Sequence, residues 1–301
     1  MSKSAFLFPG QGAQSVGMGK QLYESSPATR GLFDRATEIL GFNLPQVCFQ
    51  GPAERLNSTV VSQPAIYVVS LAALECLRAN DPNIENSSVA AAGLSLGEYT
   101  ALVFAGAMTF EDGLRVVKRR GEAMQAASDA TSSGMLSILG LERDAVESIC
   151  AEARKTGIMQ VANLLCPGNI AVSGESKACE EVERLVPEKG GRTIRLAVAG
   201  AFHTELMKPA DQALAAVLAE ISIRSPRVPV WSNVDAQPHM NPEGIRDLLI
   251  RQVLQPVLWE QTMRNLLEQG VDQFVEIGPG RVLAGLLKRV QRKVECRNVS
   301  A

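Results

Sequence analysis

Ser95 lies in the segment Gly93-Leu94-Ser95-Leu96-Gly97, which has the Gly-x-Ser-x-Gly spacing of a nucleophile elbow. An apolar stretch over 89–92 precedes the segment, and apolar residues at helical spacing over 99–105 follow it. A strand, a tight turn and a helix in this order would expose the serine hydroxyl at the positive end of the helix dipole, where an oxyanion is stabilised. The pattern indicates a serine nucleophile, although a strand-to-helix turn with a capping serine has the same spacing.

A serine nucleophile needs a base, and the chain contains only two histidines, His203 and His239. His203 follows Ser95 in chain order, as the elbow architecture expects, and lies in a turn of small residues that permits close approach. His239 lies in a polar loop between prolines and is the weaker candidate. No pattern in the sequence identifies an acidic residue as the third member of a catalytic triad. Glu205, Asp211 and Asp235 are candidates, and a backbone carbonyl could orient the imidazole equally well.

The composition of the 301-residue chain is that of an ordinary globular protein, with 46% hydrophobic and 21% charged residues. The formal net charge of −2 gives no global attraction to nucleic acid or to an anionic membrane, so we expect neither as a partner. The six cysteines form no Cys-x-x-Cys pair, which argues against a zinc site and for a reducing compartment. We expect no metal and no other cofactor.

The N-terminal residues reach Pro9 and Gly10 before the core of a signal peptide could form. No apolar run is expected to approach the roughly 20 residues of a membrane span. We therefore expect a protein of the cytoplasm, or of the plastid stroma if a transit peptide has been removed. The residues carry no direct sign of self-association, and we expect a monomer.

The first part of the chain has the alternation of strands and helices that is typical of an α/β unit. Residues 5–8 are predicted to form a buried strand, and the glycine-rich turn over 9–14 lacks the spacing of a nucleotide-binding loop. Thr109 and the two acidic residues after Phe110 predict the start of a helix that runs to about residue 127. Further predictions are helices over 32–40 and 65–77 and a polar link over 56–64.

A small polar stretch over 128–133, which has the composition of a hinge, separates this part from a regular pattern. The order strand, helix, strand, strand, helix, strand is predicted over 135–139, 142–155, 159–165, 170–174, 175–187 and 192–196. This order predicts a ferredoxin-like subdomain at 129–198, inserted in a large α/β-hydrolase-like domain formed by 1–128 and 199–301. Ser95 and His203 then belong to one domain, and a cleft forms where the two domains meet.

The remaining segments are predicted to complete the large domain. They are a helix over 205–221, a strand over 228–233, a loop over 238–242, helices over 245–253 and 258–268, a last strand over 274–277 and a helix over 282–290.

The sequence resembles the malonyl-CoA:acyl-carrier-protein transacylases of fatty acid synthesis over nearly the whole chain, from Phe8 to Arg289. The blocks that carry the resemblance are specific together where one alone would not be. They include Gln63-Pro64-Ala65, Ser95-Leu96-Gly97-Glu98-Tyr99, Arg120-Gly121-Glu122-Ala123-Met124, Phe202-His203, Asn233-Val234-Asp235 and Gly278-Pro279-Gly280. The resemblance implies transfer of malonyl from malonyl-CoA to the phosphopantetheine thiol of an acyl carrier protein through a malonyl-serine intermediate.

The resemblance also implies roles for individual residues. Ser95 matches the family nucleophile, His203 its general base and acid, and the main-chain carbonyl of Gln252 the group that orients the imidazole. The backbone N–H groups of Gln11 and Leu96 match the oxyanion donors, a role in which backbone geometry matters more than side-chain type.

Arg120 matches the family residue that binds the malonyl carboxylate, and a planar guanidinium suits a carboxylate better than lysine does. Helical geometry allows at most one or two of the adjacent bases 118–120 to face inward. The other substrate-binding positions that the resemblance implies are Gln63, Met124 and Phe202, the last an aromatic residue consistent with rejection of an extra methyl group. Carrier proteins are acidic, so we expect a basic rim, with Arg192, Arg195, Lys288 and Arg289 as candidates.

The sequence departs from the family pattern at two positions. Leu94 stands where the family usually has histidine, and Leu165 stands where many members have asparagine. We expect activity to survive the first departure because the base is His203. The alternatives that stay open are a serine thioesterase or carboxylesterase with the same serine and histidine, a polyketide-pathway acyltransferase, and a non-catalytic module that binds carrier proteins.

Overall fold

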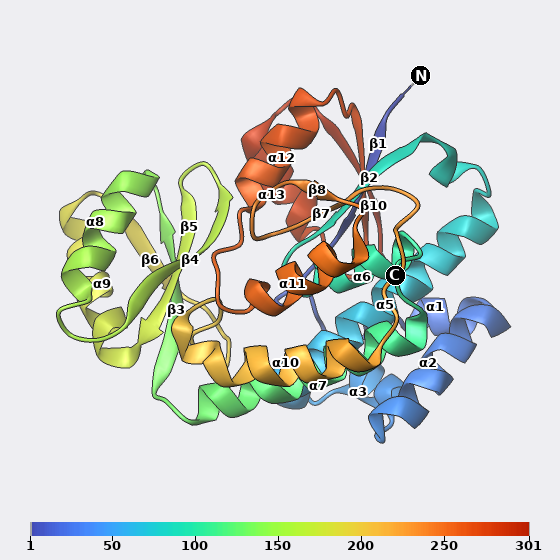
Figure 1. Ribbon diagram of the computed structural model, residues 1–301, viewed down its shortest axis with the longest axis horizontal. Helices are drawn as coiled ribbons and strands as arrows, with labels where there is room; N and C mark the ends of the chain where they lie inside the picture. Colours follow the sequence, from blue (N-terminus) through green and yellow to red (C-terminus); the bar gives the residue numbers. More distant parts are fainter. Residues whose placement is uncertain (1, 301) are drawn as a thin grey trace.

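A computed structural model describes residues 2–300, and its larger unit is built on a six-stranded sheet with the order β10-β9-β1-β2-β7-β8 (Figure 1). Neighbouring strands pair in parallel except β7 and β8, which are antiparallel. The strands are β1 (Ser4–Phe8), β2 (Ser88–Gly93), β7 (Val230–Trp231), β8 (Pro238–His239), β9 (Gln273–Ile277) and β10 (Glu295–Val299).

Both faces of this sheet are covered by helices, and the alternation of side chains along β1 shows why. Phe6 and Phe8 pack into one hydrophobic core with α5 (Thr59–Asn80) and α7 (Phe110–Asp129), whereas Ala5 and Leu7 pack into a second core with α12 (Trp259–Glu268) and α13 (Val282–Val290). The helices of this unit are α1 (Lys20–Ser25), α2 (Pro27–Leu40), α3 (Leu44–Gln50), α4 (Ala53–Asn57), α5 (Thr59–Asn80), α6 (Gly97–Phe104), α7 (Phe110–Asp129), α10 (Lys208–Glu220), α11 (Pro242–Gln252), α12 (Trp259–Glu268) and α13 (Val282–Val290), with 3-10 turns η1 (Ile84–Ser87) and η2 (Glu205–Met207).

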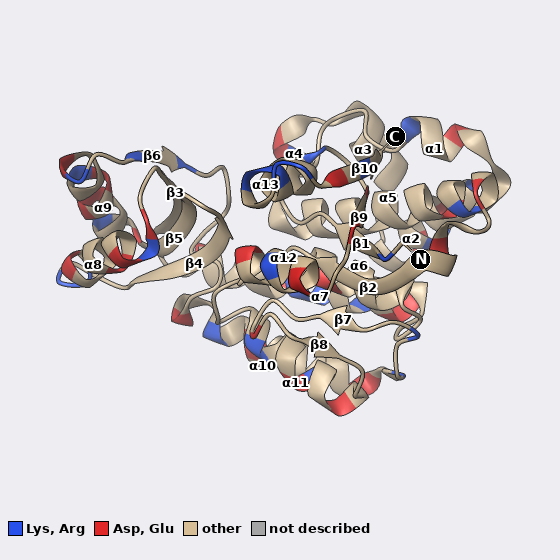
Figure 2. Cartoon of the chain, turned by 90° about the horizontal axis from the view of Figure 1, so that it is seen from above, with Lys and Arg blue, Asp and Glu red and all other residues tan. Residues whose placement is uncertain are grey.

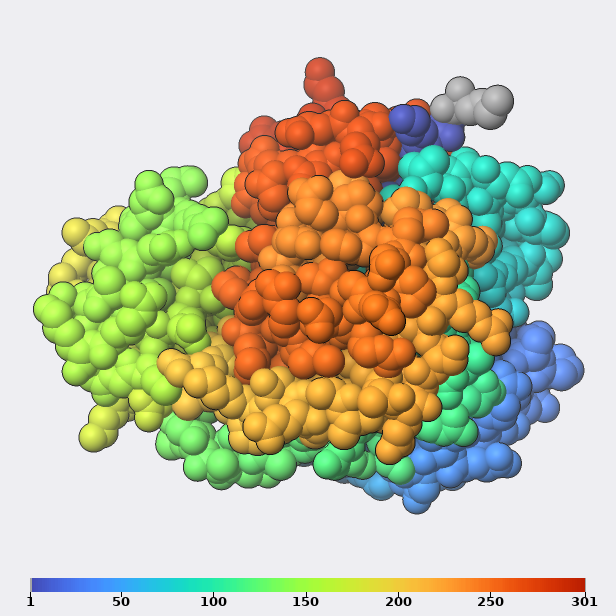
Figure 3. Space-filling model, viewed as in Figure 1, coloured from blue at the N-terminus to red at the C-terminus, as the bar shows by residue number. Residues whose placement is uncertain are grey.

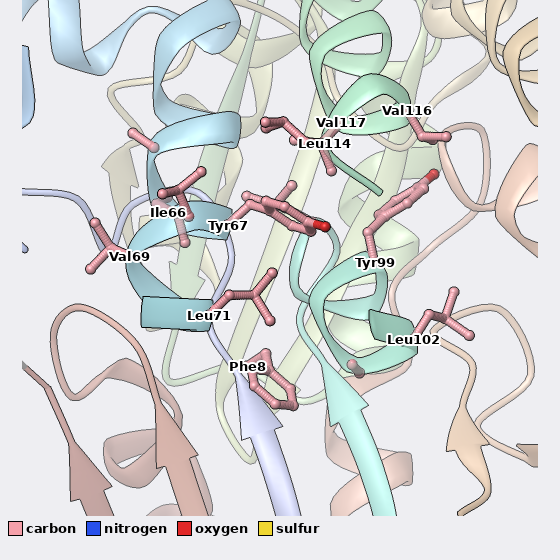
Figure 4. Packing of buried hydrophobic residues seen from close by; sticks show 14 of the residues in the cluster. Phe8, Ile66, Tyr67, Val69, Leu71, Tyr99, Leu102, Leu114, Val116 and Val117 are labelled. Atoms are coloured by element: carbon pink, nitrogen blue, oxygen red, sulfur yellow. The ribbon is translucent and has the colours of Figure 1, made fainter. Parts of the chain in front are cut away.

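Helix α5 passes through the larger of the two cores. Its 22 residues, with a mean hydropathy of 1.6 over the most apolar stretch, are long and apolar enough to cross a membrane, so the prediction that no run approaches such a length was wrong. In the fold 83% of that stretch is buried. Tyr67 of α5 lies near Leu114 of α7 and above Phe8 at the end of β1 (Figure 4). This packing identifies α5 as the core helix of a globular fold.

The smaller unit, residues 133–195, contains a separate four-stranded antiparallel sheet with the order β4-β5-β3-β6. Its elements follow the predicted order: β3 (Ser133–Leu139), α8 (Arg143–Ala153), β4 (Met159–Cys166), β5 (Asn169–Glu175), α9 (Ser176–Glu188) and β6 (Arg192–Arg195). Helices α8 and α9 pack with the sheet around a third hydrophobic core. Figures 1 and 3 show this unit at one end of the molecule, beside the segments that carry α10 and α11.

Several local predictions were wrong. The predicted polar link over 56–64 contains the end of α4 and the start of α5, because the buried side chains of 61–64 pack into the core and support the helix despite Pro64. The predicted loop over 238–242 contains β8, which pairs with a shorter β7 than expected. The strand over 274–277 is not the last, since β10 extends the sheet at its edge.

Candidate active site

The segment around Ser95 forms a sharp turn between β2 and α6, with Ser95 in the left-handed region at φ 51°. Such a conformation costs a residue with a side chain on the order of 1–3 kcal/mol, so the surroundings must hold it. The backbone N–H of Ser95 donates to Oδ1 of Asn233 at 2.6 Å. A Cβ at Gly93 or Gly97 would collide with neighbouring backbone, which explains the two glycines of the motif.

His203 meets this turn from a position 108 residues further along the chain. Its Nε2 lies 2.9 Å from Oγ of Ser95, and its Nδ1 lies 2.8 Å from the main-chain oxygen of Gln252. Because a carbonyl only accepts, Nδ1 carries the proton and Nε2 is free to accept the hydroxyl hydrogen of Ser95. His203 is also in the left-handed region, at φ 61°, which aims the ring at the elbow.

The acidic candidates for a third triad member do not contact this imidazole. Within residues 2–300 no carboxylate makes a hydrogen bond to His203. Asp235 instead contacts Nε2 of His239 at 3.0 Å, and Glu205 and Asp211 lie at the start of η2 and α10. His239, the weaker candidate for the base, therefore lies outside the site.

Burial governs the protonation of the candidate base. His203 is 3% exposed, and burial, with a smaller contribution from the positive charge of Arg120, lowers its pKa from 6.5 to about 4. The hydrogen bond to Gln252 opposes this shift without cancelling it. The imidazole is therefore neutral, and able to accept a proton, at any pH well above 4.

We expect the ring of His203 to stay neutral, with its proton on Nδ1, from about pH 8 down to about pH 5. Its ring nitrogens can be followed by NMR after labelling of histidine. The variant His239→Asn assigns the signals, because the chain has only these two imidazoles. A titration of His203 at or above its ordinary pKa of 6.5 would contradict the buried, carbonyl-bound geometry.

Arg120, in α7, is 1% exposed and bonds to the same hydroxyl. Its Nη2 donates to Oγ of Ser95 at 2.9 Å and to Oε1 of Gln252 at 3.1 Å, and its Nη1 donates to Oε1 of Gln63 at 2.8 Å. The guanidinium also lies 5.4 Å from the ring centre of Tyr99. Among the described residues no carboxylate lies within 4.0 Å of it, so it is a buried cation without a direct ion pair.

A cavity of about 80 Å³ opens beside these groups, between the larger and the smaller unit. The larger unit contributes Gln11, Ser95, Arg120, Met124, Phe202 and His203, and the smaller unit contributes Met135 and Asn163. Gln63 does not line this cavity, because it lies behind Arg120 and binds its guanidinium. Its expected place at the substrate stays a prediction, and the contact that the structure shows is the one to Arg120.

Two backbone N–H groups remain available beside the serine. Gln11 follows the end of β1, and Leu96 precedes the first residue of α6, so both lie at the carboxyl ends of parallel strands. Neither N–H donates to another group within the described part of the chain.

Leu94, the first of the two departures from the family pattern, lines the cavity, and 9% of its surface is exposed.

The sequence assigned no role to three side chains that lie in the site, those of Glu98, Asn233 and Gln252. Glu98 and Asn233 belong to segments that carry the family resemblance, and Gln252 was predicted to act only through its main-chain carbonyl. Glu98 accepts hydrogen bonds from both of the others. A glutamate in the first turn of the elbow helix was the only signal in the sequence, and it has the same pattern as an ordinary acidic helix start.

The chain is similar in sequence and in structure to known acyl transferases. Residues 5–300 match the family described as "Acyl transferase domain". The chain is 44% identical over 302 residues to the malonyl CoA-acyl carrier protein transacylase of Bacillus subtilis, covering 100% of this chain and 94% of that protein. The crystal structure of an acyl-carrier-protein-S-malonyltransferase from Bartonella henselae has a TM-score of 0.96 at 38% identity, covering 99% of this chain and 96% of that chain. A malonyl-transacylase solved in complex with a type II polyketide acyl-carrier protein has a TM-score of 0.94 at 38% identity, with coverages of 99% and 96%.

Proposed function

This chain belongs to the acyl transferase domain family, and from the geometry of its site we infer that Ser95 carries the transferred acyl group as an ester. The protein transfers the malonyl group of malonyl-CoA to the phosphopantetheine thiol of an acyl carrier protein, for fatty acid chain elongation. One observation carries the assignment of the site: Oγ of Ser95 lies 2.9 Å from both Nε2 of His203 and Nη2 of Arg120.

In the first half-reaction Oγ of Ser95 attacks the thioester carbon while its proton passes to Nε2 of His203. The negative charge that develops on the carbonyl oxygen is stabilised by the N–H groups of Gln11 and Leu96. Collapse of this intermediate breaks the carbon–sulfur bond, and the imidazolium returns the proton to the sulfur of CoA. In the second half-reaction the carrier thiol attacks the serine ester by the same steps. No cofactor takes part.

Arg120 binds the carboxylate of the malonyl group in this scheme. A carboxylate taken into a site of about 80 Å³ needs a partner, and the buried guanidinium supplies a cation with a planar set of donors. An acetyl group has no carboxylate and gains nothing from this partner. Gln63 and Gln252 hold the guanidinium from behind, so its position is set before substrate arrives.

The carrier protein docks, in this proposal, on the exposed bases near the opening between the two units. Figure 2 shows the basic residues of α13 and of β6 on the same side of the molecule. Arg192 and Lys288 are exposed, and Arg289 donates to the main-chain oxygen of Pro167. Arg195 is a weaker member of the expected rim, because two hydrogen bonds tie it to Glu183.

We propose the finer description of the fold and of the setting on the same basis. The larger unit, 1–128 with 199–301, is an α/β-hydrolase-like domain, and 129–198 is an inserted ferredoxin-like domain. The protein works as a monomer in the cytoplasm, or in the plastid stroma after loss of a transit peptide. A polyketide carrier is the alternative acceptor, and transfer to carrier proteins of both pathways, measured side by side, distinguishes the two.

The proposed function is tested by incubation with malonyl-CoA followed by peptide mass spectrometry. We expect a malonyl ester on the peptide that contains Ser95, and its loss when a carrier protein with its phosphopantetheine thiol is added. A carrier protein without that group is the control and should leave the ester in place. Free malonate without a retained ester would identify a hydrolase instead, and absence of any thiol-dependent exchange would identify a binding module.

A further inference from the structure

Glu98 is a buried carboxyl group beside the site that the mechanism above does not use. It lies in the first turn of α6, three residues after Ser95, and is 3% exposed. Its Oε2 accepts from the backbone N–H of Asn233 at 3.0 Å and from Nε2 of Gln252 at 2.7 Å. Burial raises the pKa of Glu98 to about 7, and these two donors oppose the shift. The carboxyl group is thus anchored to two segments that meet at the site.

The bond to Glu98 determines which way the side-chain amide of Gln252 points. Nε2 of Gln252 donates to Oε2 of Glu98, so the NH₂ group of the amide faces Glu98. The amide oxygen then faces Nη2 of Arg120, at 3.1 Å. The reversed amide would place donors against the guanidinium, which can only donate. One amide orientation therefore satisfies Glu98 and Arg120 together.

The separation between Glu98 and Arg120 leaves the guanidinium free to bind a substrate. A buried cation needs a compensating charge or hydrogen-bond acceptors. A direct ion pair would occupy the donors of Arg120 that the substrate carboxylate needs. Glu98 contacts Gln252, which contacts Arg120, so the carboxyl group and the guanidinium are separated by one side-chain amide. Nε of Arg120 has no hydrogen-bond partner among residues 2–300.

The same amide also contacts the nucleophile turn. Nε2 of Gln252 donates to the main-chain oxygen of Ser95 at 3.0 Å, and Asn233, whose backbone N–H is bound by Glu98, accepts from the N–H of Ser95. Glu98 is thereby connected through two neutral residues, Asn233 and Gln252, to the backbone of the nucleophile, and through Gln252 to the carboxylate-binding arginine.

We propose that Glu98 is a positioning residue for substrate specificity, which fixes the side-chain amide of Gln252 and through it holds Arg120 where the malonyl carboxylate binds. The proposal rests on the function proposed above. Glu98 does not touch the substrate, and its effect is expected on the preference for malonyl over acetyl donors more than on the transfer chemistry itself.

The test measures the malonyl preference, defined as the ratio of kcat/KM for malonyl-CoA to that for acetyl-CoA with one carrier protein as acceptor. Glu98→Met removes both acceptor oxygens at similar length, and we expect the preference to fall about tenfold or more, the usual effect of losing a hydrogen bond to a charged group. Glu98→Gln keeps an acceptor oxygen and should retain the preference within about threefold. In an Arg120→Ala background, Glu98→Met should change the preference no further.

Glu276→Met is the matched control for a general loss of stability. Glu276 is also a fully buried glutamate, but it accepts from the N–H groups of Leu283 and Ala284 at the start of α13. Its replacement should lower the melting temperature and reduce malonyl and acetyl transfer equally. If Glu98→Met does not fold, the malonyl preference of Glu98→Asp provides the test instead. Aspartate is one methylene group shorter, so its carboxyl group lies further from the amide of Gln252.

The proposal is overturned if the folded Glu98→Met or Glu98→Asp variant keeps the wild-type preference. It is also overturned if Glu98→Gln loses as much preference as Glu98→Met, or if the loss persists undiminished in the Arg120→Ala background. These outcomes differ from a failure of the proposed function, in which the wild-type protein itself would form no malonyl ester.

Discussion

Ser95→Ala is expected to lower malonyl transfer by about 10⁵-fold, because alanine has no oxygen to carry the acyl group. Any residual rate would come from the oxyanion donors and from binding of the two substrates side by side. The fold should remain, since the backbone N–H of residue 95 keeps its bond to Asn233. Transfer to the carrier thiol is measured directly, and the melting temperature checks the fold.

Ser222→Ala is the control for this variant, because Ser222 is an exposed serine just after α10. It should transfer malonyl at the wild-type rate. If Ser95→Ala kept more than about one hundredth of wild-type transfer, the nucleophile would have to be another group, and the assignment of the elbow would fail.

Arg120→Ala is expected to lower kcat/KM for malonyl-CoA by about 10²–10³-fold. Removal of one partner of a buried charged pair costs roughly 3–5 kcal/mol, and each 1.4 kcal/mol corresponds to about a factor of ten. Acetyl-CoA presents no carboxylate, so its transfer should fall far less, and the preference for malonyl should largely disappear. Rates for the two donors, measured with the same carrier protein, provide the test.

Arg120→Lys separates charge from geometry at this position. Lysine keeps a positive charge but lacks the planar fork that donates hydrogen bonds to the side-chain oxygens of Gln63 and Gln252 at once. We expect a malonyl preference between those of the wild type and Arg120→Ala. Equal rates of malonyl and acetyl transfer in the wild type, or an unchanged preference in Arg120→Ala, would show that another group binds the carboxylate.

Much of the fold could be predicted from local patterns. The order of elements in residues 133–195 follows from alternating apolar periodicities, and the structure has the same order. Thr109 caps α7 by accepting from the N–H of Asp112, as the side-chain types indicate. Of the three adjacent bases in that helix only Arg120 is fully buried, which agrees with the limit of one or two that helical geometry sets.

The predictions that were wrong concern elements whose structure depends on contacts with segments far away in the sequence. The strand β10 has a mixed sequence, Glu295-Cys296-Arg297-Asn298-Val299, and it exists because it hydrogen-bonds to the edge of β9. The start of α5 was missed because Pro64 normally interrupts a helix, whereas the core around it supports one. The bond from Arg120 to Gln63 joins positions 57 residues apart, and no local pattern indicates it.

The sequence by itself determined which chemical groups this protein has and the local shape around each one: a serine in a strained turn between glycines, a histidine among small residues, an arginine on the inner face of a helix. Only the tertiary structure decided that these groups meet. The contacts of Ser95 with Arg120, His203 and Gln252 join positions 25, 108 and 157 residues apart. The periodicity of apolar residues indicates which face of each helix or strand is buried. Contacts between side chains that are distant in the sequence depend on how all the helices and strands pack together.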